Sequence, residues 1–202
     1  IAIIEKIIIS LLTIEKAFRK NQLLSYFRNR PKYLLIGNYH KKKMSNIFSL
    51  FGNDIIYYGV DDIFQKTNLS DKIDNNLSFF TSRTDRNLDI LIEIWKNDVF
   101  KNRSLSKLYV TPIKQDLKNY NIFNRPMLSK PEYINQILKS RMIILPGHKA
   151  ELFCLAALEA SELCIPVVTM GIGSLSERIE HNVTGLVSKN KSEFAKNILE
   201  MY

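Results

Sequence analysis

Residues 145–160 read LPGHKAELFCLAALEA and residues 165–169 read IPVVT, and these two stretches decide the fold of the chain. An apolar run ends at Pro146 and Gly147, which interrupt regular structure and close a predicted strand. A helical pattern follows over residues 153–163, and a second apolar, β-branched run follows the helix. Strand, helix and strand in this order are typical of a parallel β/α unit.

The same alternation of short apolar runs and amphipathic stretches extends over the last 125 or so residues. Strands are predicted at residues 77–81, 108–110, 142–145, 167–169 and 185–187. Helices are predicted at residues 87–96, 131–139, 153–163, 175–179 and 192–202. The pattern indicates an α/β domain with a Rossmann-like parallel sheet.

The chain before residue 77 has a different organisation. A long helix is predicted over residues 1–27, followed by a strand at 33–36, a helix at 44–51 and a strand at 55–58. We interpret residues 1–65 as the remnant of an amino-terminal α/β domain, residues 66–76 as a polar linker without periodicity, and residues 77–202 as the second domain. Because the chain starts at Ile1 and stops in a helical pattern, we expect a fragment of a longer protein.

Composition limits the possible partners of the chain. Its formal charge of +9 suits nucleic acid, an anionic membrane surface or a phosphorylated small molecule. The basic residues are scattered, the densest run being residues 41–43, and no aromatic-rich RNA-binding signature accompanies them. A solvated lysine-rich face is therefore the preferred interpretation, with no nucleic-acid partner.

Features of the opening segment and the cysteines bear on location. Glu5 and Lys6 interrupt the apolar residues 1–12, so this segment falls short of a membrane span. Cys154 and Cys164 lack metal-ligand spacing and suit a reducing cytoplasm. We expect a cytoplasmic protein without a metal site, and peripheral contact at the inner face of a membrane remains a weaker hypothesis.

Two glutamates mark the candidate site. Glu151 and Glu159 would lie about 12 Å apart along a common helix, at about 1.5 Å per residue. The amino terminus of that helix would favour a diphosphate, and each carboxylate could accept hydrogen bonds from sugar hydroxyls. The arrangement fits a nucleoside diphosphate sugar. The structural alternative is that Glu151 only caps the helix and Glu159 is only solvated.

A pair of arginines precedes the predicted helix at 87–96. Arg83 and Arg86 are suited to clamp a diphosphate and to neutralise it as a leaving group. The structural alternative is an exposed pair with no ligand. His148 lies in the loop after the strand at 142–145, where it is either solvated or within reach of a ligand.

Taken together, residues 145–160, 165–169, 173–178 and 184–187 resemble the donor-binding domain of family 4 glycosyltransferases of the GT-B architecture. In that family an E-x7-E pair occupies the place of Glu151 and Glu159. The resemblance implies that Glu151 contacts the donor sugar and that Glu159 binds the ribose hydroxyls. It further implies that the backbone of Phe153, Cys154 and Leu155 meets the sugar and diphosphate, while Glu177 supports the site.

Two further segments are similar to landmarks of the same family. Residues 58–64, YGVDDIF, resemble its interdomain segment, and residues 81–87, TSRTDRN, resemble its first strand and the loop that carries a basic pair. Family members usually carry Arg and Lys five or six positions apart. Here two arginines are three positions apart, which makes Arg83 the weaker match. Cys164 replaces the usual glycine before the strand at 167–169, and Leu152 replaces a small residue.

The resemblance implies a retaining, hexosyltransferase-type enzyme that moves a sugar from a nucleoside diphosphate sugar to a glycan or lipid-linked acceptor. Such an enzyme would act in polysaccharide or lipopolysaccharide synthesis and would need no cofactor or metal. The family's acceptor-side histidine has no clear counterpart, which agrees with a missing amino-terminal domain. An isolated fragment is expected to be inactive.

Two alternatives belong to other functional classes. A noncatalytic nucleotide-binding or assembly module could keep the same fold without transferring sugar. A dinucleotide-binding oxidoreductase is suggested by Gly171 and Gly173 after a strand. Ser176 takes the place of its third glycine, and Glu193 lies in a helical pattern instead of at a strand end, so the pattern disfavours this second alternative.

Overall fold

The computed structural model describes residues 23–44, 46–69 and 72–202. The chain divides into two compact units, with the boundary between Tyr58 and Gly59. Each unit has a hydrophobic core of its own. Of the helix predicted over residues 1–27, residues 1–22 lie outside the described residues.

The described part of the first unit contains a two-stranded parallel sheet. Its elements are α3 (Leu23–Asn29), β1 (Tyr33–Leu35), α4 (Asn38–Lys43), the 3-10 turn η1 (Asn46–Ser49) and β2 (Asn53–Ile55). The strand at 33–36 is confirmed at β1. The helix predicted over 44–51 is present only as the 3-10 turn η1, because Met44 adopts an extended conformation that separates it from α4. The strand predicted at 55–58 lies earlier, at β2.

The second unit is built on a six-stranded parallel sheet in the order β5-β4-β3-β6-β7-β8. The strands are β3 (Asp74–Phe79), β4 (Lys107–Val110), β5 (Ile122–Asn124), β6 (Ser140–Gly147), β7 (Val167–Ile172) and β8 (Gly185–Val187). Numbered along the sheet's own strands, this is the order 3-2-1-4-5-6 of a Rossmann fold. The predicted α/β class with a Rossmann-like sheet is confirmed.

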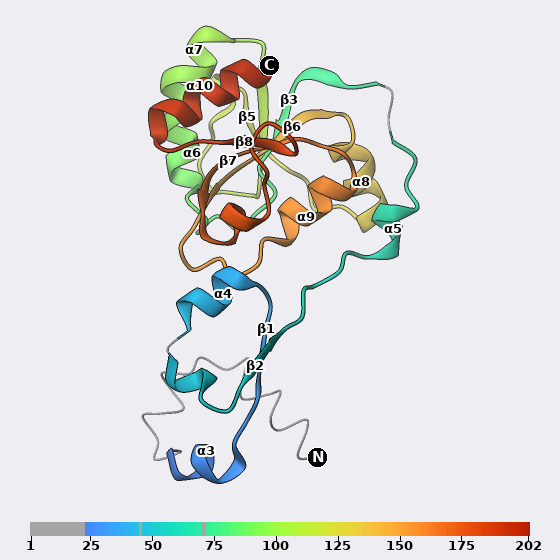
Figure 1. Ribbon diagram of the computed structural model, residues 1–202. Coiled ribbons are helices and arrows are strands. Elements are labelled where there is room, and N and C mark those ends of the chain that lie inside the picture. Colours follow the sequence, from blue (N-terminus) through green and yellow to red (C-terminus); the bar gives the residue numbers. More distant parts are fainter. Residues whose placement is uncertain (1–22, 45, 70–71) are drawn as a thin grey trace. The chain divides into compact units, whose positions relative to one another are not determined.

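Helices cover both faces of this sheet. They are α5 (Asp62–Gln65), α6 (Leu88–Ile94), the π-helical segment η2 (Trp95–Val99), α7 (Phe100–Asn102), α8 (Lys130–Ile137), α9 (Leu155–Glu162) and α10 (Lys191–Met201), with 3-10 turns η3 (Lys118–Tyr120) and η4 (Gly173–Glu177). Figure 1 shows α6 and α10 on one side of the sheet and α8 and α9 on the other. The near-continuous apolar strands follow from this two-sided burial.

Buried apolar side chains explain why the predicted strands form where they do. Ile143, Ile144 and Leu145 of β6 are at most 1% exposed, and so are Val167 and Val168 of β7. Burying a side chain of this size contributes about 1.5–3 kcal/mol, so alternative registers would be strongly disfavoured.

Some elements differ from the sequence-based predictions. Strand β3 begins at Asp74, inside the predicted linker, and α6 continues through η2 and α7 to Asn102. Neither β5 nor α5 was predicted, because each is only three or four residues long and carries little periodicity.

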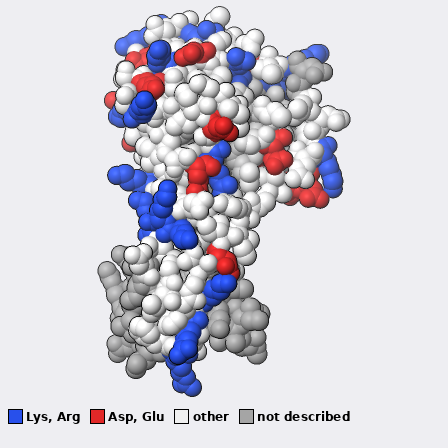
Figure 2. All heavy atoms as spheres, viewed as in Figure 1, with Lys and Arg blue, Asp and Glu red and all other residues white. Residues whose placement is uncertain are grey.

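Charged side chains of both signs are interspersed on the surface of the second unit. On the face drawn in Figure 2, Asp and Glu lie among the Lys and Arg side chains. Lys191 and Glu93 form one such exposed pair, at 3.0 Å. Within the described ranges, no helix has both the length and the apolar character needed to cross a membrane.

Candidate functional site

The candidate site lies where the strand order of the larger sheet reverses. Strand β3 pairs with both β4 and β6, so the chain leaves β3 in one direction along the sheet and later leaves β6 in the other. The connections after these two strands run over opposite faces, which opens a crevice at their carboxyl ends. The loop after β3 carries Arg83 and Arg86, and the loop after β6 carries His148 and Glu151.

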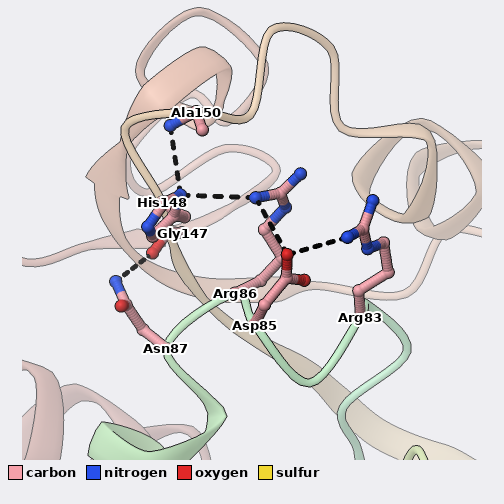
Figure 3. A network of polar contacts seen from close by, with 7 residues as sticks. All are labelled: Arg83, Asp85, Arg86, Asn87, Gly147, His148 and Ala150. Carbon is pink, nitrogen blue, oxygen red and sulfur yellow. Dashed lines mark hydrogen bonds and ion pairs between the residues drawn. The ribbon is translucent and has the colours of Figure 1, made fainter.

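Hydrogen bonds join these two loops, as Figure 3 shows. The Asn87 side-chain amide donates to the Gly147 carbonyl oxygen, at 2.5 Å. An Arg86 terminal nitrogen lies 3.3 Å from His148 Nδ1. The Ala150 amide N–H donates to that same Nδ1 at 3.1 Å. Because both neighbours are donors, Nδ1 acts as an acceptor, and any ring proton lies on Nε2.

The two arginines differ in their surroundings. The Arg83 side chain is 75% exposed and pairs with Asp85 at 2.8 Å. The Arg86 side chain is only 16% exposed and lies 3.7 Å from the same carboxylate. Figure 3 shows Arg86 directed toward His148 and Arg83 farther from it, beside Asp85. By the switch-point rule, we place Arg86 in the crevice and Arg83 at its rim. His148, predicted to be either solvated or within reach of a ligand, is half-buried, and its Nδ1 is hydrogen-bonded to Arg86 and to the Ala150 amide.

The loop between β6 and α9 is held by contacts with η4. The Glu151 amide donates to the His148 carbonyl at 2.9 Å, and the Ser174 amide donates to the Glu151 carbonyl at 3.0 Å. Gly173 is buried with a φ of +78°, and a Cβ atom there would overlap the His148 carbonyl oxygen. The loop can approach η4 this closely because residue 173 has no side chain.

The structure corrects the prediction that Glu151 and Glu159 share one helix. Helix α9 begins at Leu155, so Glu151 lies four residues before it, in the loop. The predicted separation of 12 Å along a helix axis therefore does not apply. Instead, the loop places Glu151 beside the amino terminus of α9, and Glu159 lies in the second turn of the helix.

The residues around the start of α9 combine a buried thiol with the amino terminus of a helix. Cys154 is 1% exposed and precedes the helix, and burial raises the pKa of its thiol to about 12, with a further contribution from Glu151. The thiol therefore stays protonated at neutral pH and is not a nucleophile. The ring of Phe153 stacks under the Arg178 guanidinium, 3.8 Å from the ring centroid to Cζ. Leu155 is the exposed first residue of the helix. The amides of Ala156 and Ala157 in its first turn interact with the Cys154 sulfur, and the amino terminus of the helix favours an anion.

Glu159 lies on α9 and is half-buried near α8. Burial raises the pKa of its carboxyl above the ordinary value of about 4.5, and the nearby charges of Lys130 and Arg125 oppose that rise. Burial raises the pKa of Tyr133 to about 12, and the negative charge of Glu159 contributes to that rise. Arg125, Lys130 and Tyr133 were missed in the sequence because β5, the strand that precedes them, was not recognised.

The remaining predicted residues lie near this arrangement. Glu177 is exposed at the end of η4, whose first residues contact the loop that carries Glu151. In the segment that resembles an interdomain landmark, Asp61 caps α5 by accepting from the Ile63 amide and pairs with Lys130 at 2.7 Å. Within the described residues, no group of three or more His, Cys, Asp or Glu side chains is arranged to hold a metal ion.

Comparisons with known proteins bear on the family and the fold of the chain. Residues 115–202 match the family model described as glycosyl transferases group 1. No curated protein matches the sequence. The fold is that of GT-B glycosyltransferases, a class whose solved structures are similar to this chain over most of its length.

Three solved structures illustrate the similarity. Staphylococcus aureus TarM, solved with fondaparinux, α-GlcNAc-glycerol and UDP, has a TM-score of 0.67 and 18% identity over 84% of this chain and 36% of its own. The pneumococcal O-GlcNAc transferase GtfA, solved with UDP and GlcNAc, has a TM-score of 0.66 and 12% identity over 90% of this chain and 40% of its own. A Rickettsia africae glycosyltransferase has a TM-score of 0.66 and 17% identity over 93% of this chain and 56% of its own. The chain thus spans between about a third and somewhat over half of the proteins named here.

Proposed function

We propose that this chain contains the donor-binding part of a retaining glycosyltransferase of GT-B family 4, in which Arg86 and the α9 amino terminus bind the diphosphate of a nucleotide sugar. The observation that supports this most directly is the partly buried Arg86 at the switch point of the sheet, oriented by His148. Anion-binding groups from two loops converge at the place where this fold binds nucleotides.

The roles of the other residues follow from their positions. Glu151, in the loop before α9, would contact the donor sugar, and Glu159 would accept hydrogen bonds from the ribose hydroxyls. The backbone of Phe153, Cys154 and Leu155 would face the sugar and diphosphate, with Glu177 as a support from η4. When the bond between the sugar and the diphosphate breaks, charge develops on the diphosphate, and Arg86 with Arg83 at the rim would stabilise it. No metal or cofactor has a role in this proposal.

The setting of the reaction is also part of the proposal. Residues 1–65 would belong to the acceptor-side domain, residues 66–76 to the junction and residues 77–202 to the donor domain. The proposed acceptor is a glycan or lipid-linked molecule of polysaccharide synthesis, reached in the cytoplasm. For peripheral membrane contact, we expect the chain to sediment with anionic liposomes at low salt, and its staying in the supernatant would remove that part.

Calorimetric titration of the chain with UDP-, GDP- and ADP-sugars tests the proposal. We expect one of these donors to bind and Glu159→Ala to weaken that binding about tenfold, since hydrogen bonds to a charged group contribute about 1.5–3 kcal/mol. Glu162→Ala, on the last turn of the same helix, is the control and should bind as the parent chain does. A folded chain that binds none of the donors would contradict the proposal.

Donor binding should also depend on the protonation of Glu159. Its pKa is raised, so the carboxyl begins to take up a proton at a higher pH than an ordinary glutamate, and binding to the carboxylate should release that proton. As the pH falls through this window, we expect affinity to decrease about threefold to tenfold, because a carboxylate accepts stronger hydrogen bonds than a carboxylic acid. A sugar nucleotide is the suitable probe because its diphosphate has no terminal group that titrates in this range. Glu159→Gln should flatten the profile, and an unchanged slope would assign the titration to another group.

A further inference from the structure

We propose that Arg125 recognises the base of the donor. It selects a base with a carbonyl oxygen at the position of uracil O4 or guanine O6 over a base with an amino group there, as in cytosine and adenine. This inference rests on the proposed function and names the class of nucleotide. It concerns the region beyond the ribose, on the side of Glu159 away from the diphosphate.

Arg125 lies at the carboxyl end of the sheet. It directly follows β5, and its amide donates to the Val110 carbonyl at 2.7 Å, which continues the ladder between β4 and β5. Its guanidinium lies over the ring of Tyr133 on α8, 4.9 Å from Cζ to the ring centroid. Because the backbone is paired and the guanidinium stacks on a half-buried ring, the side chain is held in place above this edge.

The neighbours of Arg125 place it next to the proposed ribose position. Arg125, Lys130 and Tyr133 all interact electrostatically with Glu159, which lies across from them on α9. Figure 1 shows α8 and α9 on the same side of the sheet. If the diphosphate lies at the start of α9 and the ribose at Glu159, the base lies on the other side of the ribose from the diphosphate, and Arg125 is the residue after β5 that lies near Glu159.

The Lys130 and Arg125 side chains both lie near Glu159, but they differ in whether they are already paired within the protein. The Lys130 ammonium is engaged by Asp61 at 2.7 Å. The Arg125 guanidinium forms no ion pair within the part of the chain that the structure describes. Its buried Nε atom also has no hydrogen-bond partner among the described residues. Because Nε is buried, the terminal nitrogens of the Arg125 guanidinium are the donors that remain for a ligand.

The chemistry of the guanidinium determines which bases it accepts. Arginine carries five N–H donors and no acceptor. Guanine offers O6 and N7 as acceptors, and uracil shares the O4 acceptor of thymine, whereas cytosine and adenine present an amino donor at the corresponding position. A donor facing a donor leaves both groups unpaired, so UDP and GDP should bind better than CDP and ADP.

The test measures the affinity of the full chain for four nucleotides, UDP, CDP, GDP and ADP, by calorimetry. We expect UDP to bind at least about tenfold more tightly than CDP, or GDP than ADP, since a good pair of contacts to a base discriminates by about this factor or more. Whether UDP or GDP binds more tightly decides between the two carbonyl-bearing bases.

Variants separate base recognition from a structural role. Arg125→Ala should bring each ratio to within about threefold, and Arg125→Lys should keep the charge but lose most of the discrimination because it lacks the planar fork. Glu159→Ala should weaken all four nucleotides by a similar factor and leave the ratios unchanged. Thermal unfolding of each variant verifies that it is folded.

The possible outcomes distinguish this inference from the proposed function. Equal affinities of the parent chain for carbonyl- and amino-bearing bases would overturn the inference but not the proposed function. Ratios that survive in a folded Arg125→Ala variant would overturn it as well. If no nucleotide binds to the folded parent chain, the proposed function fails and this inference fails with it.

Discussion

Gly173→Ala should lower the free energy of unfolding of the second unit by about 2–5 kcal/mol and abolish detectable nucleotide binding. Residue 173 has a φ of +78°, a conformation that costs an L-amino acid about 1–2 kcal/mol. The added methyl group would also overlap the His148 carbonyl oxygen and lie 3.1 Å from that of Glu151, and such overpacking costs about 1–3 kcal/mol. Both overlapped residues belong to the candidate site, so relieving the clash would displace it.

Urea denaturation and calorimetry with the donor that binds best would measure the two effects. Gly59→Ala is the matched control, because a Cβ atom at residue 59 meets nothing within 4 Å. That variant should unfold within about 0.5 kcal/mol of the parent chain, as exposed substitutions usually do. A Gly173→Ala chain that is as stable as the control and binds nucleotide normally would show that the loop does not depend on this close approach.

Arg86→Ala should weaken the binding of a nucleoside diphosphate by about 10- to 100-fold, the effect expected when a hydrogen bond to a charged group is lost. The Arg86 side chain is only 16% exposed, so its interaction with an anion is poorly screened by solvent. His148 and Asp85 hold it in the crevice at 3.3 Å and 3.7 Å. Its orientation therefore precedes ligand binding and does not have to be acquired at that step.

Arg83→Ala provides the comparison within the same loop. This side chain is 75% exposed and already pairs with Asp85 at 2.8 Å, so we expect its removal to reduce affinity by no more than about threefold. Calorimetric titration with UDP or GDP at two salt concentrations measures both variants, and the loss caused by Arg86→Ala should persist at the higher salt concentration because that interaction is poorly screened. Equal losses in the two variants would refute the distinction between a crevice arginine and a rim arginine.

Much of the larger unit was predictable from local pattern alone. The strands at 108–110, 167–169 and 185–187 were located to within a few residues, because buried parallel strands are short apolar runs bounded by turn residues. The helices before and after them carry apolar residues at helical spacing, and α8 carries in addition a complete capping box at Ser129 and Glu132. Elements with such signals need no knowledge of distant residues.

Short elements and loop geometry could not be obtained in this way. Strand β5 has three residues and forms because Ile122 packs in the core and β4 supplies its hydrogen bonds. The start of α9 was placed near Phe153 because that apolar residue extends the helical pattern, but the loop instead binds the backbone of η4 through Ser174. Contacts between residues 14 or more positions apart decide both features.

Local sequence pattern was enough to predict a Rossmann-like α/β domain, and the family resemblance pointed to the two glutamates and two arginines of the candidate site. How these four residues differ in their surroundings depends on the fold. In the folded chain, Arg86 lies in the crevice and Arg83 lies at its rim. Glu151 lies in the loop before α9, and Arg125 lies near Glu159. Residue types and their spacing can be read along the sequence. Burial, screening by solvent and the approach of separate loops depend on which strands, distant in sequence, pair with one another.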